Sequence, residues 1–185
     1  YDYSTVQIGE QCWFSENCRY LPSVSPSSAG SETSPYYYVN VYNGIDVAAA
    51  KATANYDTYG VLYNWPAVMT EGICPSGWHI PTDGEFTELT DFLGGESVAG
   101  YVIKSTSGWL SGGNGSNSSG FDCRPGGFVY PGGFSLDGSF GFWWSSSASG
   151  SSSAWDRNLY DLDDDVYRYI SSRGRGHSAR CVRDY

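Results

Sequence analysis

Glycine, serine and aromatic residues take up much of this chain, and the long runs of Ala, Glu, Lys, Leu and Arg that build helical bundles are missing. The 185 residues include 24 Gly, 16 Tyr and 7 Trp, and 16% of them are charged. Low charge and many aromatic side chains argue against disorder, while the missing helix-forming runs argue against a bundle. Because this length suits one domain with a substantial core, we expect a single, β-rich and largely irregular domain over residues 1–185.

Formal charge is distributed unevenly between the body of the chain and its last segment. The whole chain carries a charge of −10 and has a pI near 4.4. Residues 1–144 hold 4 Lys or Arg and 14 Asp or Glu, whereas residues 145–185 hold 6 Arg and 6 Asp and are neutral. An acidic body offers no phosphate-binding footprint, so we expect no nucleic-acid partner. No run of 18 apolar residues exists, so we expect no membrane insertion.

Local patterns predict several strands and one clear helix. Residues 3–14 alternate around Gly9 and predict an opening hairpin, and residues 36–44 predict a strand with an Asn-Gly turn. Residues 46–57 predict a short helix, whereas residues 59–69 are apolar at both helical and strand spacings, so their type stays open. The clearest helix follows Pro81, with a cap, an apolar stripe and a terminating glycine pair: Thr82 or Asp83, then Phe86, Leu89 and Leu93, then Gly94 and Gly95.

Several short blocks of sequence occur in a fixed order along the chain. They are QCWFSEN (11–17), YGVLYNW (59–65), CPSGWHIP (74–81), KSTSGW (104–109), GF (120–121), PGG (125–127), WWSS (143–146) and RCV (180–182). In this order they resemble the family called the Fibrobacter succinogenes major paralogous domain, from about residue 5 to the end. The resemblance implies an α+β domain with a C-type lectin-like fold of the formylglycine-generating-enzyme type: short twisted antiparallel strands, one or two helices and extensive loops.

The same resemblance implies a disulfide between Cys74 and Cys181, the recurring pair of the family. Such a bridge closes a loop of about a hundred residues and would contribute roughly 4–5 kcal/mol in the chain-entropy model. The other cysteines depart from the family pattern. We expect Cys12 and Cys18, six residues apart, to form a local bridge and Cys123 to remain a free thiol. Disulfides fit a protein that works outside a reducing cytosol, at a cell or virion surface.

The last segment lacks particular residue types. Residues 145–185 contain no Lys, Glu, Gln or Met, although at the rate of residues 1–144 about three would be expected in 41 residues. Randomising the two adenines of an Asn codon cannot produce Lys, Glu, Gln, Met or Trp, but it can produce Asp, Tyr, Ser, Gly, Arg, His and Ile. The segment therefore resembles the variable region of a diversity-generating retroelement protein, at about residues 145–180.

This resemblance implies a non-enzymatic domain that binds a protein or glycan on a target surface. Tyr, Ser, Gly and Arg, which dominate the segment, are also the residues that paratopes use. If residues 154–160 form a strand, alternation places Trp155, Arg157 and Leu159 on one face and the residues between them on the other. After a turn at 163–165, Val166, Arg168 and Ile170 likewise share one face. The remaining positions form the predicted ligand-binding set: Asp156, Asn158, Tyr160, Tyr167, Tyr169, Ser171, Arg173, Arg175 and His177.

Other functions compete with this interpretation. Tyr-rich alternating strands are also typical of an ordinary half-exposed sheet, and a fixed-specificity surface adhesin or glycan-binding lectin-like domain is the alternative function. Asp163 and Asp165 are candidates for a Ca²⁺ site, but consecutive aspartates in a strand cannot all face one ion, which favours a solvated turn. Trp143 and Trp144 could stack on a sugar or belong to the core.

Catalysis is not expected. His79 lies in the CPSGWHIP block, where a framework role is favoured. The sequence contains no nucleotide-binding or Ser/His/Asp signature, and the paired active-site cysteines of formylglycine-generating oxidases have no clear counterpart. We therefore expect no cofactor.

Overall fold

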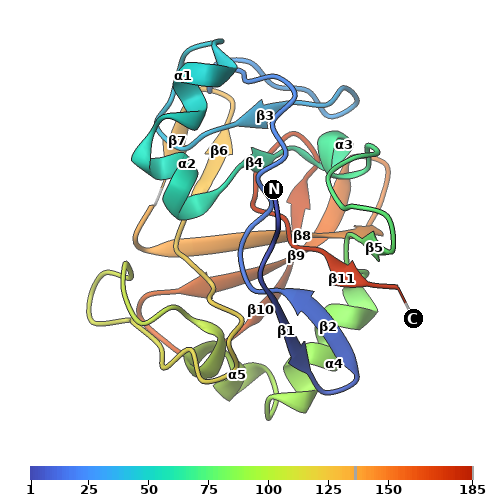
Figure 1. Cartoon of the computed structure of the whole chain (residues 1–185), viewed down its shortest axis with the longest axis vertical. Helices are drawn as coiled ribbons and strands as arrows, with labels where there is room; N and C mark the ends of the chain where they lie inside the picture. Colours follow the sequence, from blue (N-terminus) through green and yellow to red (C-terminus); the bar gives the residue numbers. More distant parts are fainter. Residues whose placement is uncertain (136, 185) are drawn as a thin grey trace.

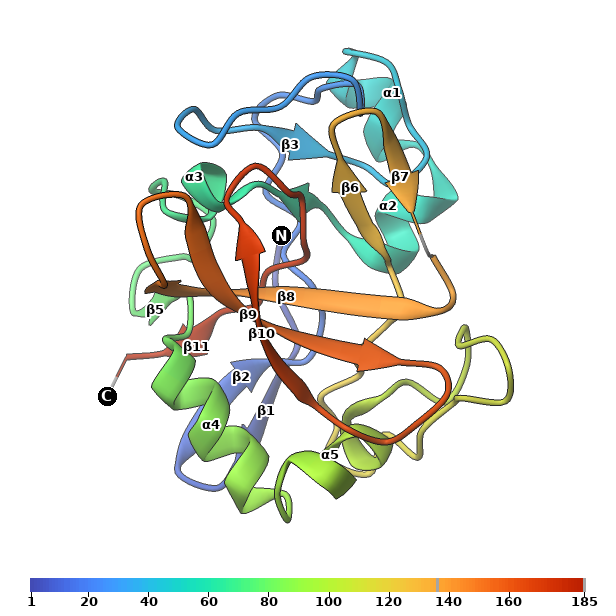
Figure 2. The same ribbon diagram turned by 180° about the vertical axis from the view of Figure 1, so that it is seen from behind.

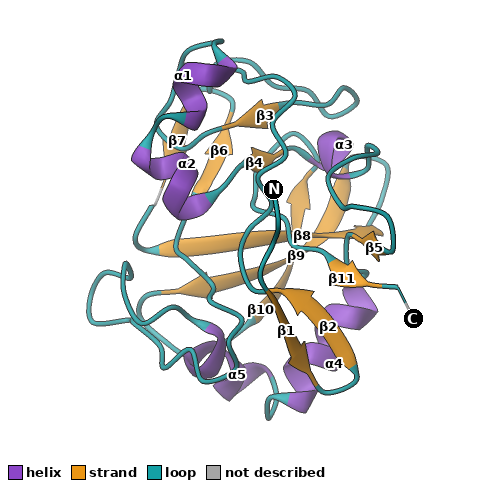
Figure 3. Cartoon of the chain, in the orientation of Figure 1, coloured by secondary structure: helices purple, strands orange, loops and turns teal. Residues whose placement is uncertain are grey.

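The computed structural model describes residues 1–135 and 137–184 of the chain. Its helices are short (Figure 3): α1 (Val47–Lys51), α2 (Ala54–Tyr59), α3 (Trp65–Val68), α4 (Asp83–Phe92) and α5 (Glu96–Ile103). Its strands are β1 (Thr5–Ile8), β2 (Gln11–Phe14), β3 (Tyr37–Tyr38), β4 (Leu62–Tyr63), β5 (Trp78–His79), β6 (Phe128–Tyr130), β7 (Gly133–Ser135), β8 (Phe140–Ala148), β9 (Ser153–Tyr160), β10 (Tyr167–Ser172) and β11 (Val182–Arg183). The chain is thus a mixed α and β protein of small antiparallel sheets with few helices.

A three-stranded antiparallel sheet crosses the middle of the molecule. Its order is β10-β9-β8, and both outer strands pair with β9 (Figures 1 and 2). On one side of β8 lie α1, α2, β3 and the β6-β7 hairpin, and on the other side lie α4, α5, β1 and β2. The predicted strand at 154–160 is confirmed, and the second predicted strand corresponds to β10.

The two ends of the chain meet in a second sheet. Its order is β1-β2-β11-β5, so the last strand lies between the opening hairpin and the block that precedes α4. Val182 pairs with Trp13 of β2 on one side and with His79 of β5 on the other. The predicted hairpin is confirmed, and its turn contains Gly9 at φ +60°, a left-handed conformation that glycine adopts without strain.

Helix α4 forms where the sequence predicts it, because its first turn contains a complete capping box. The Thr82 side chain accepts a hydrogen bond from the Glu85 amide, and the Glu85 carboxylate accepts one from the Thr82 amide at 2.7 Å. Phe86 and Leu89 are buried against the core. The glycines after the helix both have positive φ and end it, as expected.

Tertiary hydrogen bonds change two of the local predictions. Asn43 Oδ1 accepts hydrogen bonds from both the amide and the hydroxyl of Ser27, so the Asn-Gly pair does not form a hairpin turn and β3 is only two residues long. The undecided segment 59–69 divides at Asn64, which caps α3 through a bond from the Ala67 amide. The segment thus contains a short strand and a short helix.

Arg180 joins the two main hydrophobic clusters of the core. One cluster includes Phe14, Tyr63 and Trp144, and the other includes Trp13, Phe121 and Trp143. The Arg180 side chain is fully buried, and its guanidinium lies 4.4 Å from the centroid of the Phe121 ring. It donates to the carbonyl oxygens of Phe14, Phe121 and Asp122 and to the side-chain oxygen of Asn17. A buried cation thus satisfies acceptors from both clusters.

The structure confirms one predicted disulfide and contradicts the other. Cys74 and Cys181, which are 107 positions apart in the sequence, are bridged. Cys12 and Cys18 are both free, so the prediction of a Cys12–Cys18 bridge is wrong. The reason is that the Cys18 amide donates to the Ala179 carbonyl, which places Cys18 in the first hydrophobic cluster beside Cys181, a cluster to which Cys12 does not belong. Cys123 is free and buried, as expected.

Replacing Arg180 by Met should cost roughly 3–5 kcal/mol of unfolding free energy, because each buried acceptor left unpaired costs about 1–3 kcal/mol. Arg183→Met is the matched control, since Arg183 is exposed and should change stability by less than about 0.5 kcal/mol. Urea unfolding followed by tryptophan fluorescence would measure both values. Equal stability of the two variants would contradict the role of Arg180 as the joint of the core.

Candidate ligand-binding surface

Strand register brings most of the predicted ligand-binding residues onto one face of the central sheet. Asn158 pairs with Phe142 on β8 and with Tyr167 on β10, and Asp156 pairs in the same way with Trp144 and Tyr169. Directly paired residues of antiparallel strands lie on the same face. We call this face, with Phe140, Phe142, Trp144, Asp156, Asn158, Tyr160, Tyr167, Tyr169 and Ser171, the C-terminal sheet face.

Four predicted site residues on or against this face are buried and are not displayed as predicted. Asp156, Asn158, Ser171 and His177 have exposed fractions of 0–3%. The cause is the chain that follows β10. Gly176 and Val129 exchange backbone hydrogen bonds at 2.9 Å, and the residues after Gly176 continue along Tyr63 and Trp143. This return of the chain covers one end of the face, which strand alternation alone does not reveal.

The other end of the face carries an exposed stripe of aromatic rings. Tyr169 is 60% exposed, and Tyr160 and Tyr167 are partly exposed. The Tyr160 ring stacks on Tyr167 at 4.8 Å and meets Phe140 edge-on at 4.3 Å. The Tyr167 hydroxyl donates to Asp163 at 2.9 Å, and this bond raises the pKa of Tyr167 to about 12. The stripe is therefore held in place while its ring edges remain accessible.

The sequence analysis missed the aromatic residues of β6 and β8 that extend this stripe. Phe128 lies 5.0 Å from Phe142, and Tyr130, which is 44% exposed, lies 5.9 Å from Phe128. A period-two signal was present on β8, where Phe140, Phe142 and Trp144 alternate with Gly141 and Trp143. No comparable signal indicates that the short β6-β7 hairpin lies beside β8.

The arginines of the segment divide into two groups by their partners. Arg168 lies 3.5 Å from the centroid of the Trp155 ring and donates to both oxygens of Asp83, and Arg157 also donates to Asp83 at 2.7 Å. Partial burial favours a higher pKa for Asp83, but the hydrogen bonds from these arginines hold it below its usual value. Arg173 and Arg175 lie over Trp65 and Phe128 and have no carboxylate partner among the described residues. These two guanidinium groups remain able to bind an acceptor on a partner.

Unpaired polar atoms gather at the covered end of the face. Asp156 Oδ2, Ser171 Oγ and both ring nitrogens of His177 are buried without a hydrogen-bond partner among the described residues. The His177 ring lies against Trp144 and Phe142, with centroids 4.2 and 5.0 Å apart, and His177 Nδ1 is 3.8 Å from Asp156 Oδ2. Asn158, oriented with its amide nitrogen toward Asp156, donates to Asp156 Oδ1 at 2.6 Å. Native proteins contain few such unpaired atoms, so a cluster of them indicates a special position.

Burial controls the protonation of this cluster. It raises the pKa of Asp156 to about 6, and burial together with the nearby Arg175 charge lowers the pKa of His177 well below its usual value. Both shifts favour the neutral side chains.

The aspartates of the β9-β10 turn are engaged by protein groups. Asp163 accepts hydrogen bonds from the Tyr167 hydroxyl and the Asp165 amide, and its carbonyl accepts one from the Lys104 ammonium group. Lys104 also lies 3.7 Å from the Asp164 carboxylate. Within the described part of the chain, no group of three or more His, Cys, Asp or Glu residues is arranged to hold a metal. The Asp163 carboxylate therefore serves as a hydrogen-bond acceptor within the turn.

His79 connects elements of the framework. Its ring nitrogens lie 2.8 Å from Glu85 on α4 and 2.5 Å from Asp184 near the end of the chain. This arrangement agrees with the framework role favoured for the CPSGWHIP block. Trp143 and Trp144 are both buried and belong to the core, so neither offers a platform for a sugar. No helix among residues 1–135 and 137–184 has the length and apolar character needed to cross a membrane.

Asp156→Asn should make the protein more stable than the wild type at pH 7 by about 2–3 kcal/mol. In the wild type, the unfolded state loses its proton near pH 3.9 and the folded state only near pH 6, so stability falls as pH rises through that window. His177 is present in both proteins, so its contribution cancels in the difference. Urea unfolding at pH 4, 5, 6 and 7 measures this difference, and the exposed Asp2→Asn serves as control. If the difference in unfolding free energy between Asp156→Asn and the wild type does not change with pH, the raised pKa of Asp156 is contradicted.

Comparison with protein families bears on the whole chain. The sequence model of the Fibrobacter succinogenes major domain matches residues 6–183. No curated protein and no solved structure matches the chain. Because the match extends over nearly all residues, the chain belongs to the Fibrobacter succinogenes major domain family.

Proposed function

We propose that this chain is a non-enzymatic ligand-binding domain with a C-type lectin-like fold, and that a diversity-generating retroelement diversifies its C-terminal segment, about residues 145–180. Its partner is a protein or a glycan on a target surface, and the domain works outside the cell, at a cell or virion surface. The disulfide between Cys74 and Cys181 agrees with an oxidising compartment. The proposal treats residues 1–185 as one domain and assigns it no cofactor.

One spatial observation carries the proposal. Seven residues of types that adenine mutagenesis can produce lie on or beside the C-terminal sheet face: Asp156, Tyr160, Tyr169, Ser171, Arg173, Arg175 and His177. Trp155 is the one residue of 145–185 that this mutagenesis cannot produce. It lies on the opposite face of β9, beneath Arg168. The one type in this segment that adenine mutagenesis cannot produce thus lies off the C-terminal sheet face, together with Arg157 and Leu159.

The accessible groups of this face suit macromolecular recognition. Tyr160, Tyr167 and Tyr169 offer aromatic area with few rotatable bonds. Arg173 and Arg175 add two guanidinium groups that have no carboxylate partner among the described residues, although Arg173 donates to the backbone carbonyls of Gly150 and Ser153. Tyr and Arg are enriched among residues that dominate binding energy. An arginine with no internal carboxylate partner can pair with an acidic or carbonyl group of a ligand without breaking an existing ion pair.

The covered end of the face supports diversification in a different way. Asp156, Ser171 and His177 form a buried cluster of unpaired polar atoms. A core selected for stability alone would place apolar or mutually bonded side chains at these positions. Random replacement of codons, selected only for folding and for range of binding, permits such an arrangement. The other face contributes the stabilising contacts, through Leu159, Trp143 and the Arg157–Asp83 pair.

The second candidate function is a fixed-specificity adhesin or glycan-binding domain with the same fold. The ordered aromatic stripe of Phe128, Phe140, Tyr160 and Tyr167 favours it, because rings that are held in place suit an invariant site. The two functions differ at the level of the gene, since only the first requires a template copy of the segment.

The DNA that flanks the gene should contain a second, near-identical copy of the segment encoding residues 145–185, together with a reverse-transcriptase gene. The copy should carry adenines at the codons for Asp156, Tyr160, Tyr169, Ser171, Arg173, Arg175 and His177, and it should retain the Trp155 codon. Genome sequencing tests this expectation. If the flanking DNA contains no such copy, the fixed-specificity function stands in its place.

Residues of the exposed stripe should tolerate replacement. Tyr169→Ser and Arg175→Ser should each change the unfolding free energy by less than about 1 kcal/mol, because both are near the surface. Trp144→Ala, in the buried core of the same sheet, should cost about 3–5 kcal/mol of unfolding free energy.

Binding is tested on glycan and extracellular-protein arrays. Signals of the wild type should disappear in the double variant Y169S/R175S and persist in Glu88→Ser, a variant of an exposed residue on α4. Array binding that is unchanged in Y169S/R175S would show that the ligand binds elsewhere.

A further inference from the structure

Three cysteine sulfurs lie together at the junction between the amino-terminal segment and the last strand. The Cys18 thiol is fully buried, and its sulfur is 3.5 Å from the sulfur of Cys181, which is bridged to Cys74. The two backbones are held at this spacing by hydrogen bonds from Cys18 to Ala179 and from Phe14 to Cys181. A thiol in van der Waals contact with a disulfide sulfur is positioned to attack it.

The remaining cysteines lie elsewhere. Cys123 belongs to the second hydrophobic cluster, with Trp13 and Phe121, whereas Cys18 and Cys181 belong to the first. Cys12 is on β2, opposite Gln7, and lies in neither cluster. Cys123 is as buried as Cys18, and burial raises the pKa of both thiols to about 12. Cys123 is therefore a matched control for a buried thiol without a neighbouring disulfide.

We propose that Cys18, Cys181 and Cys74 form a thiol–disulfide exchange unit that delivers a reactive Cys74 thiol to the protein surface. The Cys18 thiolate attacks the sulfur of Cys181, the Cys18–Cys181 bond forms, and the Cys74–Cys181 bond breaks. Cys74 leaves as a thiolate and takes up the proton that Cys18 released. The step is an isomerisation, so it needs neither an oxidant nor a reductant.

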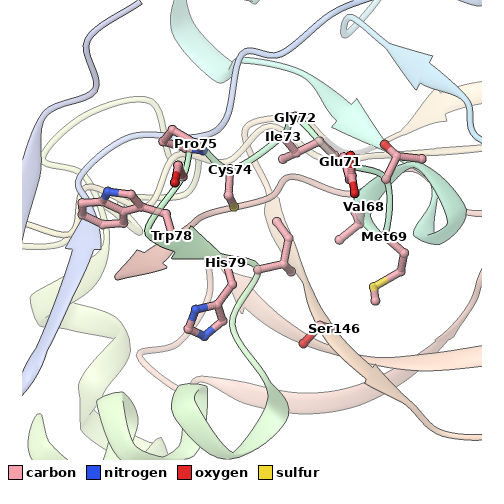
Figure 4. Close-up of a pocket in the computed structure, with 13 residues that line it drawn as sticks. Val68, Met69, Glu71, Gly72, Ile73, Cys74, Pro75, Trp78, His79 and Ser146 are labelled. Atoms are coloured by element: carbon pink, nitrogen blue, oxygen red, sulfur yellow. The ribbon is translucent and has the colours of Figure 1, made fainter. Parts of the chain in front are cut away.

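Cys74 is the member of the unit that can meet another molecule. Unlike Cys18 and Cys181 it is partly exposed, and it lines a groove of about 440 Å³ with Ile73, Trp78 and Met69 (Figure 4). Its neighbours Glu71, Gly72, Pro75 and Ser76 are exposed, so the segment around it can move away once the bond is broken. The released thiolate can attack a disulfide R–S–S–R, which forms a Cys74–S–R bond and releases RS⁻. The chemical class of the ligand is thus a molecule that carries an accessible disulfide.

Thiol–disulfide exchange within the unit is slow while Cys18 stays buried. Burial raises the pKa of Cys18, and the charge of Arg180 offsets this rise only in part, while Glu16 adds to it. The thiolate is the reacting form. At pH values below the pKa of Cys18, the exchange rate should therefore increase about tenfold for each unit by which the pH is raised.

Disulfide mapping tests the proposal. The purified domain, free of reductant, is held at pH 8.5 in mild urea, quenched with acid, alkylated with N-ethylmaleimide and mapped by mass spectrometry. We expect peptides linked through Cys18 and Cys181, with alkylated Cys74, in the wild type and in Cys123→Ser. Cys18→Ser, with Cys18→Ala as a second replacement of the buried thiol, should show no alkylation of Cys74. Equal alkylation of Cys74 in folded C18S or C18A would overturn the proposal.

Two further measurements separate geometry from reactivity. Cys74→Ser exposed to oxidised glutathione should form the Cys18–Cys181 bridge, and free thiols at both positions after this treatment would overturn the proposal. Oxidised glutathione added to the wild type should leave a glutathione adduct on Cys74 with the Cys18–Cys181 linkage, at least tenfold above the adduct level in C18S. An equal adduct level in C18S would mean that glutathione reaches Cys74 without Cys18, which also overturns it.

Discussion

The buried guanidinium of Arg180 holds the opening segment, the last strand and the segment around Phe121 together. A buried cation is costly unless its donors are satisfied, and Arg180 satisfies them with carbonyls of Phe14, Phe121 and Asp122. Asn17 completes the arrangement, because its side chain accepts bonds from Arg180 and from the Trp143 indole and donates to Ser178. Residues 176–178 are held by backbone bonds to Val129, Tyr63 and β8, and Asn17 adds one bond to the Ser178 side chain. The opening segment thus contacts the stretch of chain that covers part of the C-terminal sheet face.

The two faces of the central sheet therefore have different physical roles. One face holds Leu159 and Trp143 in the second hydrophobic cluster and ties Arg157 and Arg168 to Asp83, at the start of α4. These contacts are apolar or fully paired, and they fix the strands. The opposite face holds Asp156, Ser171 and His177, whose buried polar atoms include several without a partner among the described residues, and it also holds partly exposed tyrosines. Apart from Trp144, which packs in the first hydrophobic cluster, the C-terminal sheet face can accept many side chains because the contacts of the opposite face fix the strands.

The sequence predicted those features whose causes are local. The capping box of Thr82 and Glu85, the opening hairpin and the alternation of β9 and β10 all depend on residues a few positions apart, and each was predicted correctly. Alternation also placed Asp156, Asn158 and Tyr160 on one face with Tyr167 and Tyr169. It could not show that Gly176 pairs with Val129 and so buries part of that face. The local Cys12–Cys18 bridge failed for the same reason, because Cys18 is positioned by Ala179, far away in the sequence.

Cys181, whose sulfur contacts Cys18 and Cys74, follows Arg180 directly in the sequence. A Cys18–Cys181 bond would newly tie the opening segment to the last strand, where Arg180 donates to Phe14 and Val182 already pairs with Trp13. Only the exposed segment around Cys74 would lose its tether. Cys74 packs against the first hydrophobic cluster, but the C-terminal sheet face contains no residue of the segment 74–77, so the groove could change its covalent state while the binding face keeps its geometry.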